Sequence, residues 1–385
     1  MFAAGIVAEY NPFHNGHKYH IEQTKKMGAD HIVVILSGDA VQRGDTAVFS
    51  KYDRAQMAID QGADLVIELA APYSCAPAQV FALNAVRLLA GFGENVIQAI
   101  SFGCECADPD KLNSTADLIG RLEESDRFKE LISAGLTYPQ VVSIVAQEMS
   151  EDVKDILSDA NNVLGIEYIR AAHALAPWIA PLCIKRTGPG HGDTTVSEGF
   201  ANATLLRDRL KHGEDISSFV PQLPEVPAAF IRKADKALLY KIISADKKTV
   251  ENCPFVTQSI INRFNKAIMQ CPGSLDELAE LIKSKDITMS RVRRFLIHIA
   301  LGVTHKDMLT PVPYGRILAL NGKGARVLVK AKNRSIDYDT SLARLEKNDE
   351  CKRVAFLECN AVRLRELCSD VSFSNEYKRK IVITK

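Results

Sequence analysis

The chain has 385 residues, of which 46% are hydrophobic and 25% are charged. This composition is typical of a protein of roughly two or three domains and excludes long disordered stretches. No window approaches the roughly 20 apolar residues of a membrane helix, and the N-terminus lacks the features of a secretory signal. The nine cysteines are scattered, which is typical of reduced thiols in a cytoplasmic protein.

The two parts of the chain carry opposite charge. Residues 1–230 contain 18 Lys and Arg against 30 Asp and Glu, and residues 231–385 contain 30 against 17, so the formal charges are −12 and +13. A basic region of this kind is expected to bind a phosphate backbone. The alternative is a solvated surface that pairs with the acidic part, and charge alone does not decide between the two.

The first third of the chain predicts strands that alternate with helices. Strands are expected at 3–10, 31–38, 63–70 and 95–103, and helices at 17–28, 51–61 and 79–93. This alternation is typical of βαβ units in a parallel sheet, where ligands bind beyond the C-terminal ends of the strands. Polar or glycine-containing loops follow three of the strands, at 11–17, 38–44 and 103–105.

The rest of the chain becomes increasingly helical. We expect an acidic helical insertion at about 109–160, followed by a helix at 161–175 and a strand at 178–187. A glycine-rich loop at 188–195 and a helix at 201–213 come next. Beyond residue 230 the pattern is mostly helical, and from about 313 it mixes strand and helix. We therefore predict an α/β fold, with a Rossmann-like parallel-sheet domain over 1–215 and a helix-rich basic domain over 216–385.

One helix pattern in the basic part concentrates arginine. In SRVRRFLIHIALG the apolar residues form a stripe that leaves Arg291 and Arg294 side by side on a more exposed face. This pair is expected either to clamp the phosphates of a nucleic acid or to form ion pairs with the acidic half.

The segment Asn-Pro-Phe-His-Asn-Gly-His carries the chemistry. It leaves the first strand and opens the first helix, with His14 and His17 three residues apart near one face. A helix N-terminus offers unpaired N–H groups and a positive dipole to phosphate, and Gly16 lets a ligand approach the backbone. Two imidazoles there can donate to phosphoryl oxygens during attack at the α-phosphate of a nucleotide.

Two other interpretations of these histidines stay open on the residues alone. With His20 they fall at three-residue steps, as metal ligands on a helix could. The usual helical zinc pair is four apart with a glutamate between, so no metal site is expected. Alternatively, His14 caps the helix and His17 packs in a purely structural role.

The motif and its surroundings resemble a known family. A His-x-Gly-His motif between the first strand and the first helix resembles the signature of the nucleotidyltransferase superfamily. The longer strings GIVAEYNPFHNGHKYHI, SGDAVQRGDTAVFSKYDRAQMAI, GADLVIEL, ISFGCE, NNVLGIEYIRA, IKRTGPGHGD and RVRRFLIHIALG resemble the bacterial tRNA(Met) cytidine acetate ligase family over nearly the whole chain. That family activates acetate with ATP and acetylates N4 of the wobble cytidine of elongator tRNA(Met).

The resemblance implies a set of ATP contacts. His14 and His17 would act on the phosphates as the catalytic pair, and Gly103 would lie against the adenosine. The full set is Val7, Ala8, Glu9, Tyr10, Asn11, Pro12, Phe13, His14, Asn15, Gly16, His17, Lys18, Tyr19, His20, Gly103, Asn162 and Arg186. On the residues alone, Gly103 could be a simple turn, Asn162 a helix cap and Arg186 a surface charge.

The chain departs from the family pattern in two places. Asp39 stands where an asparagine is expected, and a carboxylate near a triphosphate is repulsive unless Mg²⁺ lies between them. The superfamily's second, serine-rich signature appears as Asn202-Ala203-Thr204-Leu205-Leu206-Arg207, which leaves Thr204 and Arg207 as candidate phosphate donors. No metal site is expected at Cys104-Glu105-Cys106, because no second pair of ligands accompanies it.

We therefore expect a cytoplasmic ligase that uses ATP with Mg²⁺, acetate and elongator tRNA(Met), with no membrane association and no protein partner that the sequence indicates. Two alternatives remain. One is a nucleotidyltransferase for a small substrate, which would not need the basic half. The other is a non-catalytic RNA-binding nucleotide sensor, which would release no pyrophosphate.

Overall fold

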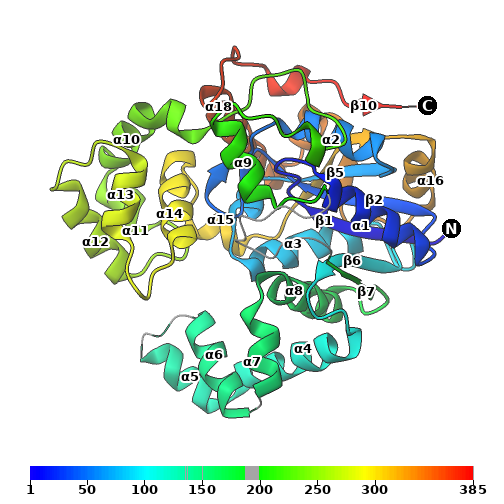
Figure 1. Cartoon of the computed structure of the whole chain (residues 1–385), viewed down its shortest axis with the longest axis horizontal. Helices are drawn as coiled ribbons and strands as arrows, with labels where there is room; N and C mark the ends of the chain where they lie inside the picture. Colours follow the sequence, from blue (N-terminus) through cyan, green and yellow to red (C-terminus); the bar gives the residue numbers. More distant parts are fainter. Residues whose placement is uncertain (135, 137, 150, 187–198, 385) are drawn as a thin grey trace.

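The computed structural model describes residues 1–134, 136, 138–149, 151–186 and 199–384. Its centre is a sheet whose parallel strands are β1 (Ala3–Ala8), β2 (His31–Ser37), β5 (Leu65–Leu69), β6 (Ala99–Cys104) and β7 (Ala180–Lys185). Figure 1 shows this sheet beside a separate group of helices. The expected Rossmann-like α/β class is confirmed, although the glycine-rich loop expected at 188–195 lies outside the described residues.

The order of the strands decides where a ligand can bind. The parallel strands run β5-β2-β1-β6-β7, so the order reverses at β1 and the connections leave in opposite directions on its two sides. In open sheets of this type the crevice lies beyond the C-terminal ends of the strands at such a reversal. The loops that follow β1 and β6 therefore meet at one place.

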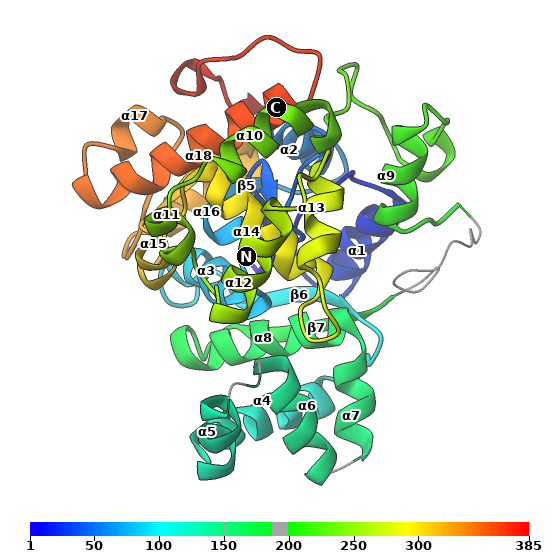
Figure 2. The same cartoon turned by 90° about the vertical axis from the view of Figure 1, so that its left-hand side faces the viewer.

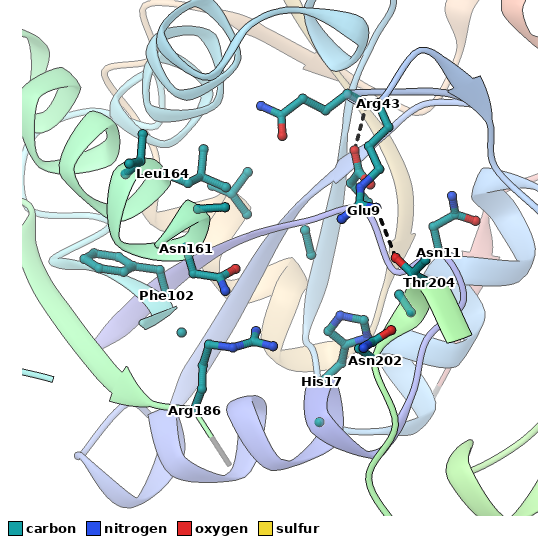
Figure 3. A pocket seen from close by; sticks show the side chains of 18 of the residues that line it. Glu9, Asn11, His17, Arg43, Phe102, Asn161, Leu164, Arg186, Asn202 and Thr204 are labelled. Carbon is teal, nitrogen blue, oxygen red and sulfur yellow. Dashed lines mark hydrogen bonds between the residues drawn. The ribbon is translucent and has the colours of Figure 1, made fainter. Parts of the chain in front are cut away.

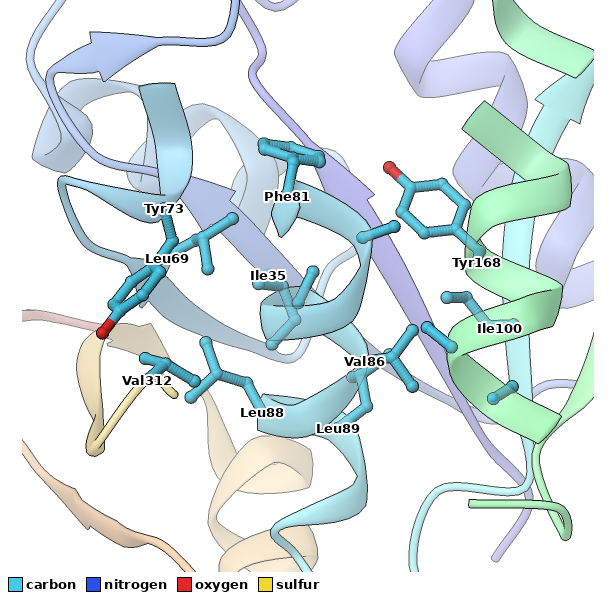
Figure 4. Close-up of a cluster of buried hydrophobic side chains, with 14 of the residues drawn as sticks. Ile35, Leu69, Tyr73, Phe81, Val86, Leu88, Leu89, Ile100, Tyr168 and Val312 are labelled. Atoms are coloured by element: carbon cyan, nitrogen blue, oxygen red, sulfur yellow. The ribbon is translucent and has the colours of Figure 1, made fainter. Parts of the chain in front are cut away.

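Helices cover both faces of the sheet. On one side lie α1 (Asn15–Lys26) and α2 (Lys51–Asp60), and on the other α3 (Ala78–Ala90) and α8 (Ala160–Leu175). All seven residues of β2 are buried. Val34 packs on the α1 and α2 side, and Ile35 packs on the α3 side, where Figure 4 shows it. A strand covered on both faces is apolar throughout, which explains the unbroken run HIVVIL.

The segment expected to be an acidic insertion is helical where the structure describes it. It consists of α4 (Pro109–Glu124), α5 (Asp126–Ser133), α6 (Tyr138–Met149) and α7 (Glu151–Ser158). Figures 1 and 2 both show these helices on the far side of α8 from the sheet. The next helix in the described part of the chain is α9 (Ala203–Lys211).

A second group of helices has its own core. It comprises α10 (Asp235–Ile243), α11 (Lys247–Glu251), α12 (Gln258–Ile268), α13 (Leu275–Ile282), α14 (Met289–Leu301) and α15 (His305–Leu309). Elsewhere in the described residues, short 3-10 turns occur at η1 (Tyr73–Cys75), η2 (Ser217–Phe219), η3 (Ile231–Ala234) and η4 (Glu376–Lys378).

The last part of the chain returns to the sheet. β8 (Tyr314–Leu320) pairs antiparallel with β5, and β9 (Asp337–Asp339) and β10 (Val382–Ile383) pair with β8. Between them lie α16 (Gly322–Lys330), α17 (Leu342–Leu345) and α18 (Asp349–Leu367). The sheet thus draws strands from both sides of residue 215, and the division into domains at that point stays a prediction.

A buried group of charges joins the two ends of the chain. The Lys51 Nζ on α2 contacts the carboxylates of Glu68 on β5, Glu358 on α18 and Glu376 on η4, and Arg316 on β8 also pairs with Glu376. All five side chains are at most 4% exposed. Buried charges are tolerated only when they are paired, so this cluster requires the N-terminal and C-terminal segments to fold together.

Candidate active site

A cavity of about 750 Å³ opens at the C-terminal ends of β1 and β6, where the strand order reverses. Figure 3 shows Arg186 and Asn161 on one side of it and Glu9, Arg43 and Thr204 on the other. Of the residues expected from the sequence, those that line it are Val7, Ala8, Glu9, Tyr10, Asn11, His14, Gly16, His17, Tyr19, His20, Gly103 and Arg186.

The remaining expected residues lie outside the cavity lining, which does not include Pro12, Phe13, Asn15, Lys18 or Asn162. Phe13 is buried in the core beneath α1, and the Asn15 amide donates to the carbonyls of Gly199 and Ser218. The Asn162 Oδ1 accepts the N–H groups of Glu105 and Cys106 at 3.0 Å each. Asn162 therefore holds the loop after β6 from behind.

The two histidines of the motif are fixed by the start of α1. The Nδ1 of His14 accepts the N–H of Gly16 at 3.1 Å, and the Nδ1 of His17 accepts the N–H of His14 at 3.2 Å, which forms a reciprocal cap. The rings stack with centroids 3.7 Å apart. A backbone N–H can only donate, so each Nδ1 carries the lone pair and each Nε2 carries the proton. The pair therefore presents two Nε2–H donors.

The surroundings keep these rings neutral in the unliganded protein. Burial lowers the pKa of His14 to about 3, with further lowering by Arg186 and Arg207. Burial also holds the pKa of His17 well below its usual range, and His14, His20 and Arg186 add to this. A neutral imidazole with a fixed tautomer is a directed hydrogen-bond donor, which suits the stabilisation of phosphoryl oxygens.

His20 has a different environment from the pair. Its Nε2 lies 2.9 Å from the Ser101 Oγ, which lies 2.7 Å from the Thr24 Oγ1. Because the Thr24 hydroxyl donates to the His20 carbonyl, it accepts from Ser101, and Ser101 in turn accepts from the His20 ring. This chain of hydrogen bonds ties α1 to β6. Within the described residues, no group of three or more His, Cys, Asp or Glu side chains is arranged to hold a metal ion.

The second signature contributes to the same cavity. Asn202 caps α9 by accepting the N–H of Leu205, and Thr204 and Arg207 line the cavity. The Arg207 guanidinium donates to the Asn11 carbonyl at 2.7 Å and to the Thr204 hydroxyl at 3.1 Å. Burial lowers the pKa of Arg207, Arg43 lowers it further, and Glu9 opposes them. The start of α9 is thus held against the loop that follows β1.

Asp39 has no place in the cavity lining. It is 2% exposed, its Oδ1 accepts the N–H of Lys51 at 2.8 Å, and the Arg54 guanidinium lies 3.2 Å away. Burial raises the pKa of Asp39, and Arg365 and Arg54 oppose this shift. The concern that this carboxylate would repel a triphosphate is therefore wrong, because its charge is turned into the protein.

Several lining residues were absent from the sequence expectation. Arg43 and Gln42 come from the turn between β3 (Ala40–Val41) and β4 (Asp45–Thr46), Asn161 from α8, and Arg294 from α14. The loop at 38–44 was expected at the ligand end of the sheet. Arg294 was indicated only as part of an exposed pair on its helix, and no local pattern placed it at this cavity. Its guanidinium donates to the Gln42 carbonyl at 3.0 Å across 252 residues of sequence.

The arginines of α14 also differ from expectation. Arg291 and Arg294 are half-buried, and Arg291 donates to the carbonyl of Phe255 at 3.1 Å. Arg293 is the more exposed arginine and forms an ion pair with Asp276. Each of these two arginines therefore uses one donor on a backbone carbonyl, and their role as a phosphate clamp stays a prediction.

The chain is similar to known proteins over nearly its whole length. The family model described as HIGH Nucleotidyl Transferase matches residues 1–380. A tRNA(Met) cytidine acetate ligase of Acetivibrio thermocellus is 33% identical over 87% of this chain and 86% of that protein, and one of Caldicellulosiruptor bescii is 33% identical over 95% and 94%. The chain belongs to the tRNA(Met) cytidine acetate ligase family.

Solved structures agree with this assignment. The apo crystal structure of Thermotoga maritima TmcAL has a TM-score of 0.91 and 25% identity, and covers 100% of this chain and 99% of that one. A second structure of the Thermotoga protein, with alpha-thio ATP bound, has a TM-score of 0.88 and 24% identity, and covers both chains completely. The fold is therefore that of the acetate ligase family. No helix in the described part of the chain is long and apolar enough to span a bilayer.

Proposed function

We propose that this protein activates acetate with ATP and transfers the acetyl group to N4 of the wobble cytidine of elongator tRNA(Met). The observation that carries the proposal is the fixed pair of Nε2–H donors at the N-terminus of α1, in a cavity whose walls also bear Arg186 and Arg207. Family membership supplies the substrates, and the cavity supplies groups that suit a polyphosphate.

In the first step, an acetate oxygen attacks the α-phosphorus of ATP and pyrophosphate leaves. We assign the ATP contacts to the expected residues that line the cavity, with His14 and His17 donating to phosphoryl oxygens as charge develops on them. Mg²⁺ bound together with ATP would neutralise part of the charge on the phosphates. In the second step, the cytidine amine attacks the acetyl carbon and AMP leaves.

A single assay with two readouts tests this function. The protein is incubated with ATP, labelled acetate and tRNA(Met), and pyrophosphate and the nucleosides of the digested tRNA are measured. Release of pyrophosphate together with labelled N4-acetylcytidine is expected. Pyrophosphate without acetylcytidine would favour a nucleotidyltransferase for a small substrate, and neither product would favour a nucleotide sensor.

A further inference from the structure

Glu9 is unusual among the residues of the cavity. The lining residues that the structure describes include the cationic side chains of Arg43, Lys185, Arg186, Arg207 and Arg294, and Glu9 is the one acidic side chain among them. ATP is a polyanion, so a carboxylate beside it weakens its binding. The presence of Glu9 in this lining therefore calls for another role. An assignment of Glu9 to phosphate contact leaves its charge unexplained.

The hydrogen bonds of Glu9 leave one oxygen available. Its Oε1 accepts the N–H of Gln42 at 2.7 Å, and its backbone carbonyl accepts from Arg54 at 2.6 Å. No described residue donates to its Oε2 or forms an ion pair with it, although the side chain is half-buried and lines the cavity. A buried carboxylate usually has a cation beside it. Here a backbone N–H holds Oε1, and the guanidiniums of Arg54 and Arg207 act on the carboxylate only through space.

The wall around Glu9 connects the cavity to the basic helical part. Gln42 is held between the two, since its N–H binds Glu9 and its carbonyl binds Arg294 of α14. Thr288 and Ser290 at the start of α14 line the same cavity. A nucleic acid that contacts the start of α14 would therefore stand at the wall of this cavity, which Gln42 links to Glu9.

We propose that Glu9 is the general base of acetyl transfer and accepts the proton of the cytidine amine through its Oε2. This inference rests on the proposed function and assigns a role within its second step. The cytidine N4 forms a bond to the acetyl carbon, and the bond from that carbon to the phosphate oxygen breaks, so the electron pair leaves with AMP. The nitrogen must lose one proton, which passes to the Glu9 carboxylate and from there to water.

Glu9→Gln separates this role from a structural one. The amide oxygen of glutamine can still accept the Gln42 N–H, so folding is retained, but the side chain can no longer take up a proton. Glu22→Gln, on the exposed surface of α1, makes the same change of charge outside the cavity. Both variants are assayed for pyrophosphate release with ATP and acetate, and for acetyl transfer from synthetic acetyl-adenylate to tRNA(Met).

We expect Glu9→Gln to slow acetyl transfer from acetyl-adenylate about 10²-fold or more, as for loss of a general base, and to slow pyrophosphate release far less. Glu22→Gln should match the wild type in both steps. Glu9→Asp, which keeps a carboxylate, should transfer acetyl faster than Glu9→Gln. An unchanged transfer rate, an equal loss in both steps, or recovery with excess Mg²⁺ would overturn the assignment. If the wild type itself releases no pyrophosphate, the proposed function fails instead.

Discussion

At the scale of single residues, the histidine pair shows how one set of atoms serves both fold and chemistry. The Nδ1 atoms of His14 and His17 close the N-terminus of α1, and this use leaves the Nε2–H groups for a ligand. The structural interpretation of the motif and the catalytic one are therefore compatible. Capping the helix also fixes the tautomer that phosphate recognition needs.

The two ring nitrogens of His17 can be tested separately. Asparagine at this position would place an oxygen near the site of Nδ1 and keep the cap, whereas glutamine would place an amide near the site of Nε2. We expect His17→Asn to lower the rate of pyrophosphate release about 10²–10³-fold, the usual cost of losing one such donor, with an unchanged Tm. His17→Gln should retain more activity. Equal rates in both variants would contradict a donor role for Nε2.

A second prediction at this scale concerns acid stability. His298 is 1% exposed, its Nε2 lies 2.7 Å from the Cys75 carbonyl, and burial lowers its pKa to about 4. In the unfolded chain a histidine binds a proton near pH ~6.5. Between these values the unfolded state holds more protons, so the free energy of unfolding should fall as the pH falls, by about 1.4 kcal/mol per pH unit.

Chemical denaturation at a series of pH values measures this contribution. Below about pH 6.5, His298→Gln should make the fall of the free energy of unfolding shallower by about 1.4 kcal/mol per pH unit. His305→Gln, at an exposed position of the neighbouring α15, controls for the substitution. Parallel pH profiles for the wild type and His298→Gln would show that His298 is not responsible for the acid sensitivity.

At the scale of elements, the β3–β4 turn is the contact between the cavity and the helical part. Gln42 and Arg43 line the cavity, and Gly44 lies against the backbone of α14. A Cβ at Gly44 would overlap the backbone nitrogen of Arg294, and the residue has a φ of +75°. Only glycine fits both requirements, because other residues strain at positive φ and carry a Cβ.

Gly44→Ala and Gly302→Ala form a matched pair. Gly302 has a φ of +77°, but no atom lies within 4 Å of the position that a Cβ would take there. We expect Gly302→Ala to cost only backbone strain, roughly 1–2 kcal/mol. Gly44→Ala should cost more and should also slow pyrophosphate release, because the turn must move away from α14. Denaturation midpoints and initial rates check this, and equal effects of the two variants would contradict the steric argument.

At the scale of the whole molecule, the buried cluster around Lys51 makes folding of the sheet depend on the last part of the chain. Three carboxylates surround Lys51, and two of them come from residues beyond 350. Lys51→Met would leave these carboxylates with Arg316 as their remaining cation within the cluster. Breaking a buried pair by removing one partner usually costs about 3–5 kcal/mol.

We therefore expect Lys51→Met to lower the free energy of unfolding by about that amount, in one transition that includes both ends of the chain. Lys352→Met removes a lysine whose ion pair with Asp349 is exposed to solvent, and should have no measurable effect. Denaturant titration followed by circular dichroism and by a probe near the C-terminus checks both. Two separate transitions in the variant would contradict the coupling.

A further prediction at this scale concerns how residues 231–385 bind tRNA. If residues 231–385 bind tRNA through phosphates, the logarithm of affinity should fall linearly with the logarithm of salt concentration. Because Arg291 and Arg294 donate to backbone carbonyls, Arg291→Ala and Arg294→Ala should leave that slope unchanged. A shallower slope in either variant would show that the arginine contacts RNA phosphate.

Local patterns in the sequence determined the strands, the helices and the position of the histidine motif, because periodicity and glycine reflect local backbone geometry. They also indicated the ligand end of the sheet. The tertiary structure alone decided which polar groups meet there. It turned Asp39 towards Arg54, placed Asn161 in the cavity with Asn162 behind it, and brought Arg294 to the loop after β2. The physical reason is that a charged or amide group is satisfied by whichever partner packing brings to it, and those partners lie up to hundreds of residues away.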